Sequence, residues 1–275
     1  MFRLERPAGR GAPVLVEVPH AGMGLPQDVR ATLMIDAATL RRDADSYVDE
    51  LYRDAPSRGA GLLVAELSRY VVDLNREETD VDEWSVREGV SRREQFPRGV
   101  IWRETGDGRT ALRAALSHAE YESRLERYYR PYHSALAREL RTLHARHGRV
   151  LLVSAHSMPG HGRAAHGKHR VRRADVVPGT RGRTTAAAAI VDAVESYFRA
   201  AGLSVRHDDP YRGGATTARW GRPAEGFHAL QIELNRALYM DERTCEPRPD
   251  GVEWLAVVCA GLVERLGEML EAVPF

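Results

Sequence analysis

Four short apolar runs, separated by longer amphipathic stretches, constrain the fold of this chain most strongly. Each run is rich in branched aliphatic residues and is bounded by Gly, Pro or His, as strands buried on both faces tend to be. The runs cover residues 14–18, 62–65, 150–153 and 229–234. The predicted helices cover residues 45–58, 111–147, 184–201 and 251–272. This alternation predicts an α/β fold with a mostly parallel mixed sheet and helices on both faces.

The chain is predicted to form a single domain over residues 1–275. No linker-like change of composition divides it, and it has no internal repeat. Residues 160–183 are rich in Gly, Arg and His and lack apolar periodicity, which predicts a long loop. A loop of that length within a compact domain is usually functional or mobile.

Composition excludes several classes of protein. The formal net charge is +1, so no global electrostatic argument favours nucleic acid or an anionic membrane as a partner. The N-terminal residues contain no apolar signal segment, and no run of eighteen apolar residues occurs, which predicts a cytoplasmic protein. The only cysteines, Cys245 and Cys259, are too far apart for a thiolate zinc motif. A bound metal would therefore need His and carboxylate ligands.

Side chains that can bind metal or transfer protons lie at or after the ends of three of the apolar runs. His20 follows the first run, His156 follows the run at 150–153, and Glu233 lies at the end of the run at 229–234. Ligands of open α/β sheets bind at the carboxyl ends of the strands, where these residues would meet. Imidazole and carboxylate groups suit a zinc site with a nearby general base. Taken singly, a His after a strand is more often a loop residue satisfied by backbone hydrogen bonds than a metal ligand.

Two carboxylates and a basic segment offer further candidates. Asp43 and Asp45 precede a helical stretch, so each could bind metal, or one of them or Ser46 could cap the helix. Residues 68–76 (SRYVVDLNR) are typical of a strand-like apolar core flanked by arginines. Arginine forks match carboxylates, so this segment could hold an acidic substrate. The alternative is an exposed strand end with solvated arginines.

Taken together and in order, these segments resemble the N-formylglutamate amidohydrolase (deformylase) family. The resemblance covers residues 14–242 and rests on segments 18–22 (VPHAG), 43–52 (DADSYVDELY), 68–76, 155–159 (AHSMP) and 230–240 (LQIELNRALYM). Residues 173–179 and 210–214 also fit. The family is similar to zinc carboxypeptidases and aspartoacylase-like deacylases, which implies a phosphorylase/hydrolase-like (zinc carboxypeptidase-like) fold.

The resemblance implies a role for each candidate residue. His20 and His156 become ligands of one Zn²⁺ ion, with Asp45, or alternatively Asp43, as the third ligand. Glu233 becomes the general base, and Arg69 faces the developing oxyanion. The implied substrate-binding residues are Asn75, Arg76, Arg212 and Arg236.

Two positions depart from the pattern of the family and its relatives. Met23 stands three residues after His20, where the related deacylases have a Glu ligand. Ser154 stands two residues before His156, where many family members have an Asp. A serine can hydrogen-bond to the imidazole but brings no charge, unless another acid such as Asp175 has taken that role.

The resemblance implies zinc-dependent hydrolysis of an N-formyl or other N-acyl amino acid, with N-formyl-L-glutamate giving formate and L-glutamate. The expected partner is thus a small acidic N-acyl amino acid. One alternative is a deacylase or carboxypeptidase-like amidase that acts on another amide. A second is a non-catalytic binding homologue. A divalent metal other than zinc is also compatible with His and carboxylate ligands.

Overall fold

A computed structural model describes residues 1–87, 96–163 and 170–272. The chain divides into two compact units. Unit 1 comprises residues 1–3, 19–46 and 64–138, and unit 2 comprises residues 4–18, 47–63 and 139–275. The prediction of a single domain stays a prediction, and each unit is described by itself.

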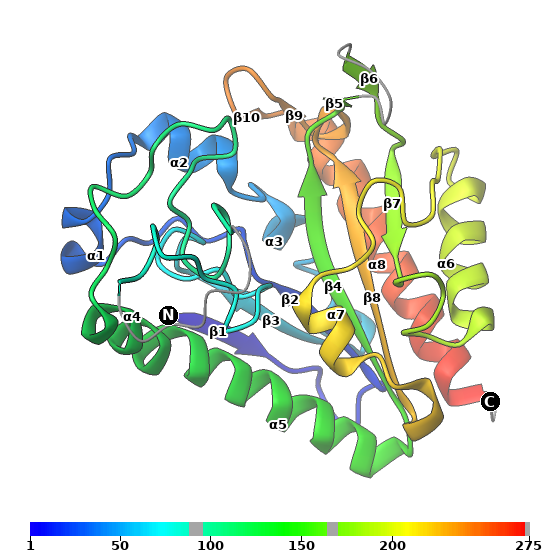
Figure 1. The fold of residues 1–275 in the computed structure, drawn as a ribbon. Coiled ribbons are helices and arrows are strands. Elements are labelled where there is room, and N and C mark those ends of the chain that lie inside the picture. The colour runs from blue at the N-terminus through cyan, green and yellow to red at the C-terminus, as the bar shows by residue number, and fades with distance from the viewer. Residues whose placement is uncertain (88–95, 164–169, 273–275) are drawn as a thin grey trace. The chain divides into compact units, whose positions relative to one another are not determined.

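A six-stranded sheet with the order β1-β3-β2-β4-β8-β7 organises the fold (Figure 1). Its strands are β1 (Phe2–Glu5), β2 (Val14–Val18), β3 (Gly61–Ala65), β4 (Val150–Met158), β7 (Val176–Gly179) and β8 (Phe227–Asn235). β2 is parallel to β4, and β4 is parallel to β8, whereas β7 is antiparallel to β8. Every residue of β2, β3, β4 and β7 is buried, so apolar side chains face helices or loops on both sides. The predicted mainly parallel sheet is confirmed.

Helices of unit 2 cover its strands. The long helix α8 (Pro249–Ala272) lies behind the sheet in Figure 1 and contacts α6 (Ala188–Ala200), while α7 (Ala215–Trp220) lies in front against β4 and β8. α8 buries Val252, Leu255 and Leu262 among others, as its helical spacing predicts. The shorter elements are α3 (Val48–Leu51), η1 (Pro56–Arg58), β5 (His161–Arg163), β6 (Arg170–Arg172), η3 (Pro223–Glu225), η4 (Arg236–Leu238), β9 (Met240–Asp241) and β10 (Glu246–Pro247).

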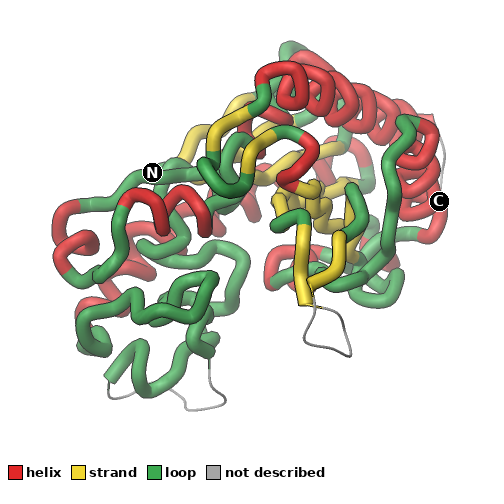
Figure 2. The backbone as a smooth tube through the Cα atoms, turned by 90° about the horizontal axis from the view of Figure 1, so that it is seen from above, coloured by secondary structure: helices red, strands yellow, loops and turns green. Residues whose placement is uncertain are grey.

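Unit 1 is built largely from loops. The described residues between β3 and α4 contain no helix or strand and appear as green tube in Figure 2. Its helical elements are α1 (Gln27–Ala31), α2 (Ala37–Asp43), α4 (His118–Arg124), the π-helix η2 (Leu125–Tyr129) and the start of α5 (Arg130–His147). Ser117 begins α4 with a capping box to Glu120, which satisfies two amides at this helix end.

The structure corrects several element boundaries. The predicted helix at 45–58 is reduced to α3 and η1. It starts only after Tyr47, which adopts a left-handed conformation with φ 68°, and residues 52–55 between the two elements form turns. The predicted helix at 111–147 begins only at residue 118, after the Ser117 cap. The predicted helix at 184–201 is confirmed as α6 with a later start. None of the described helices combines the length and apolar character of a membrane span.

Two segments predicted as irregular or extended also differ. The predicted loop at 160–183 contains β5, β6 and β7, although residues 164–169 of it lie outside the described part. β7 is only four residues long, too short for periodicity to reveal. Residues 68–76 form turns instead of the predicted strand. The sequence analysis also missed α7, which is short and carries two threonines.

Candidate metal centre

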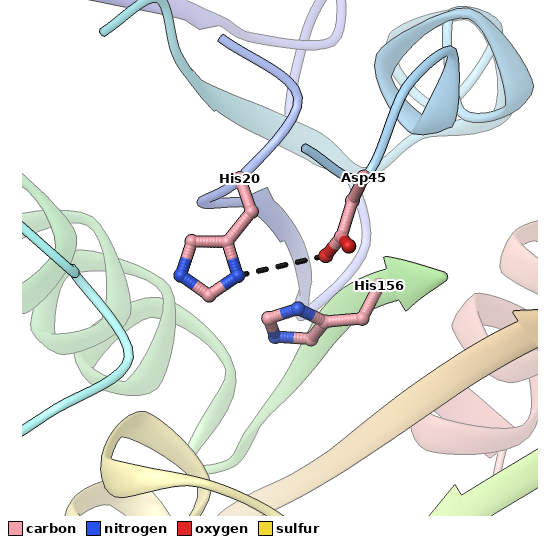
Figure 3. Close-up of side chains that lie close together, drawn as sticks. All are labelled: His20, Asp45 and His156. Carbon is pink, nitrogen blue, oxygen red and sulfur yellow. Dashed lines mark ion pairs between the residues drawn. The ribbon is translucent and has the colours of Figure 1, made fainter. Parts of the chain in front are cut away.

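His20, Asp45 and His156 form the one group of three potential metal ligands found among the described residues. Each offers one ligand atom, and these atoms all lie within 4.8 Å of one another. Figure 3 shows both imidazole rings and the carboxylate turned toward a common point. All three side chains are buried, with exposed fractions of 1%, 2% and 3% for His20, Asp45 and His156.

One ring nitrogen of His20 is already engaged by a carboxylate. His20 Nε2 lies 2.8 Å from Asp73 Oδ1, while His20 Nδ1 lies 3.5 Å from Asp45 Oδ2. A hydrogen bond from Nε2–H to Asp73 fixes the tautomer in which Nδ1 carries the lone pair. Nδ1 is therefore the atom that His20 offers at the cluster.

Asp73 is the centre of a buried network in unit 1. Its Oδ2 accepts hydrogen bonds from the Arg69 guanidinium at 2.9 and 3.1 Å and from Trp102 Nε1 at 2.9 Å, and its Oδ1 accepts one from the backbone N–H of Asn75 at 2.9 Å. Arg69 also lies 4.4 Å from the Trp102 ring centroid. Burial raises the pKa of Asp73, but His20 and Arg69 outweigh this effect and hold the pKa well below its ordinary value. Asp73 is thus a stable anion beside His20.

His156 is held by a hydroxyl group instead. Ser154 Oγ lies 3.1 Å from His156 Nε2 and 3.4 Å from Thr216 Oγ1. Ser154 and Thr216 are both buried, with exposed fractions of 0% and 1%. Because Ser154 engages Nε2, Nδ1 is the nitrogen that His156 offers at the cluster, and Figure 3 shows this nitrogen turned toward Asp45. Asp175, the alternative orienting acid, instead bonds Ser204 and Arg172.

The structure separates the two candidate carboxylates. Asp45 joins the cluster, whereas Asp43 accepts hydrogen bonds from the Tyr70 hydroxyl and from the Gly106 amide at 2.9 Å. Burial and the contact with Asp43 raise the pKa of Tyr70, which keeps the hydroxyl a donor. No side chain caps α3, so the capping alternative for Asp43, Asp45 or Ser46 is wrong. The N-cap position of α3 is occupied by Tyr47, whose side chain makes no hydrogen bond to the first amides of the helix.

Glu233 lies on β8 directly opposite His156 on β4 in the sheet register. It is buried with an exposed fraction of 5%, and its Oε1 accepts a hydrogen bond of 2.7 Å from Gln231 Nε2. Gln231 and Glu233 share one face of β8 because alternate residues of a strand point the same way. Sequence reasoning missed Gln231, although its position two residues before Glu233 was a usable signal.

The predicted substrate-binding residues occupy different environments. Arg76 Nε is buried and has no hydrogen-bond partner among the described residues. Asn75 is buried, with an exposed fraction of 8%. Arg236 is buried, and its Nε donates to Ser157 Oγ at 3.0 Å, next to His156. Arg212 is the exception, because its side chain is 68% exposed and its nearest charged partner is Asp208 at 4.0 Å.

The donor set of the cluster fits a divalent metal. Two imidazole nitrogens and one carboxylate oxygen, all buried and close together, are the ligands of many three-residue sites that keep an open position. The second nitrogen of each imidazole is hydrogen-bonded, as metal-ligating histidines almost always are.

Sequence reasoning missed Asp73, even though this residue lies within the segment at 68–76. Its place two residues before Asn75 was the available signal.

The fold is of the α/β class, and its buried His–Asp–His cluster has a donor set that fits a divalent metal. Residues 12–240 match the N-formylglutamate amidohydrolase family. The chain is 34% identical over 92% of its length to the N-formylglutamate deformylase of Pseudomonas aeruginosa, and 32% identical over 92% to that of Pseudomonas putida, and covers 92% of each. The crystal structure of N-formylglutamate amidohydrolase from Ralstonia eutropha JMP134 superimposes with a TM-score of 0.89 and 32% identity, over 98% of both chains. The chain belongs to the N-formylglutamate amidohydrolase family.

Proposed function

We propose that this protein hydrolyses the amide bond of N-formyl-L-glutamate and releases formate and L-glutamate, with one zinc ion held by His20, Asp45 and His156. The observation that carries the proposal is the buried cluster of these three side chains, in which Nε2 of each histidine is engaged in a hydrogen bond outside the cluster and Nδ1 is left facing it. The choice of substrate follows the names of the relatives from the two Pseudomonas species. A zinc carboxypeptidase-like arrangement of the sheet is part of the same proposal.

A divalent ion bound there would supply a Lewis acid that lowers the pKa of water near the scissile amide. Glu233 is the general base in this proposal. Its carboxylate takes a proton from the attacking water and returns it to the amine nitrogen of glutamate as the amide C–N bond breaks. Its burial and its place opposite His156 in the register support this role.

Arg69, Asn75 and Arg76 act on the substrate in this proposal. Arg76 Nε has no hydrogen-bond partner among the described residues, so its guanidinium can bind a carboxylate without breaking an existing bond at that nitrogen. Arg69 is held beside His20, with its guanidinium nitrogen 3.4 Å from His20 Nε2, and supplies positive charge for the developing oxyanion. Arg236, buried beside Ser157, is a second candidate for a substrate carboxylate.

Metal analysis followed by a substrate panel tests the proposal. We expect about one zinc ion per chain and formate release from N-formyl-L-glutamate, with slower release from N-formyl amino acids that lack an acidic side chain. Turnover of other N-acyl substrates with no formate release would favour the alternative amidase. A protein without metal and without turnover would be a binding homologue.

The variant Glu233→Gln separates the base from the metal ligands. We expect kcat to fall by about 100-fold or more, since general base catalysis contributes roughly 10²–10⁴-fold. Zinc content should stay unchanged. Loss of zinc from this variant would show that Glu233 is a ligand and would overturn its role as base.

A further inference from the structure

Gln231 connects Glu233 to the loop at residues 211–214, and the hydrogen bonds define its orientation. The Gly214 amide donates to Gln231 Oε1 at 2.9 Å, and Gln231 Nε2 donates to Glu233 Oε1 at 2.7 Å. The backbone N–H of Gly214 can only donate, so it must face Oε1 of Gln231, and this leaves Nε2 to donate to Glu233. Gln231 is buried, with an exposed fraction of 4%.

The loop that holds Gln231 is itself fixed by close backbone packing. A Cβ atom on Gly179 of β7 would lie 2.7 Å from the Gly213 nitrogen, so only glycine allows this approach. Gly213 adopts φ +99°, a conformation that residues with a side chain rarely adopt. Gly214 directly precedes α7, which packs on β4 and β8. The donor at Gly214 is therefore held in place by β7 and by the sheet.

We propose that Gln231 is a positioning residue that fixes the carboxylate of Glu233 by binding Oε1, so that Oε2 is presented for proton transfer. The inference rests on the proposed function of Glu233 as general base. It also assigns a role to Gly213 and Gly214, which do not contact the reacting atoms themselves but position the N–H that holds Gln231. A glutamate at position 231 could accept from Gly214 but could not donate to Glu233.

The test compares Gln231→Leu and Gln231→Glu with Thr185→Val. Thr185 is a matched control, because its hydroxyl makes a buried hydrogen bond of 2.8 Å to Ala229 on the same strand and does not touch Glu233. We expect both Gln231 variants to lose about 100-fold in kcat, the scale of a small misplacement of a catalytic group. KM and the affinity for zinc should change by less than about threefold. Thr185→Val should keep nearly full kcat.

Gly179→Ala tests the same connection from the loop. The added Cβ atom would displace Gly213 and weaken the hydrogen bond from Gly214 to Gln231. We therefore expect kcat to fall even though neither Gln231 nor Glu233 is substituted. A kcat of Gln231→Leu within about threefold of the wild type would overturn the proposal. So would an equal loss of kcat in Thr185→Val, since that would be a general effect of lost stability.

Crystal structures of the wild type and of Gln231→Leu decide the inference independently of turnover. We expect the Glu233 carboxylate to rotate away from its wild-type orientation in the variant. An unchanged Glu233 orientation would overturn the positioning role even if the wild type released no formate. Failure of the wild type to release formate would count against the proposed function alone.

Discussion

The two histidines of the cluster are held by opposite chemistry. His20 Nε2 faces the buried carboxylate of Asp73, which three further groups stabilise as an anion, whereas His156 Nε2 faces the neutral hydroxyl of Ser154. A carboxylate partner raises the basicity of a ligating imidazole, and a hydroxyl group mainly orients it. The difference teaches that, in the proposed metal site, the Asp73 side would supply the charge that strengthens metal binding, while the Ser154 side would supply geometry.

The largest expected effect follows from removing Asp73. Asp73→Asn should lower the affinity for zinc by about 10–100-fold. The free energy of unfolding should fall by about 3–5 kcal/mol, because the variant breaks a buried ion pair with Arg69. Competition with a chelator and urea unfolding measure the two quantities. Asp82→Asn is the control, since it breaks a similar buried pair with Arg103, and Asp82 does not contact His20. An equal loss of zinc affinity in both variants would show that Asp73 has no specific effect on His20 as a ligand.

A smaller effect is expected from Ser154→Ala. Loss of one neutral hydrogen bond should lower the free energy of unfolding by about 1 kcal/mol. The affinity for zinc should fall by about tenfold at most, the lower end of the range for such partners. Thr216→Val, which alters only the second hydroxyl, should have less effect on chelator competition. If Ser154→Ala weakened zinc binding as much as Asp73→Asn, the two sides of the centre would be equivalent.

Ser154→Asp tests the comparison in the opposite direction. A carboxylate beside His156 should raise the affinity for zinc by less than about tenfold, because it adds charge to the second imidazole. The metal-free variant should unfold more easily than the wild type, since a buried charge without a partner is unfavourable. Unfolding with and without zinc measures both effects. A lower zinc affinity in this variant would mean that the pocket at Ser154 has no room for a carboxylate.

The smallest effect on metal binding is expected from Trp102→Phe. This change removes the indole hydrogen bond to Asp73 Oδ2 but keeps an aromatic ring beside Arg69 and Tyr70. The free energy of unfolding should fall by about 1–2 kcal/mol, as for a hydrogen bond to a charged group. Zinc affinity should change by less than about threefold, because Arg69 still neutralises Asp73. A larger loss would show that Asp73 depends on Trp102 more than on Arg69.

Much of the sheet could be predicted from the sequence because buried parallel strands need continuous apolar runs. Residues 14–18 were predicted as a strand with the bounds that β2 has, and the runs at 62–65, 150–153 and 229–234 lie within β3, β4 and β8. Helix starts were less predictable. They depend on single residues, such as the Ser117 cap of α4 and the left-handed Tyr47 before α3, and apolar periodicity does not report on these.

The sequence by itself determined that His20, His156 and Glu233 lie near the carboxyl ends of apolar strands, which parallel strands bring to one edge of a sheet. The structure extends two of these strands beyond the apolar runs, so that His156 lies within β4 and Glu233 within β8. Only the tertiary structure decided that Asp45 and not Asp43 joins the two histidines. It alone revealed that Asp73 holds His20 across 53 residues of sequence and that Thr216 lies beside Ser154 across 62. The physical reason is that a hydrogen bond depends on atomic positions within a few tenths of an ångström, whereas a pattern of apolar residues fixes only which face of a strand or helix is buried.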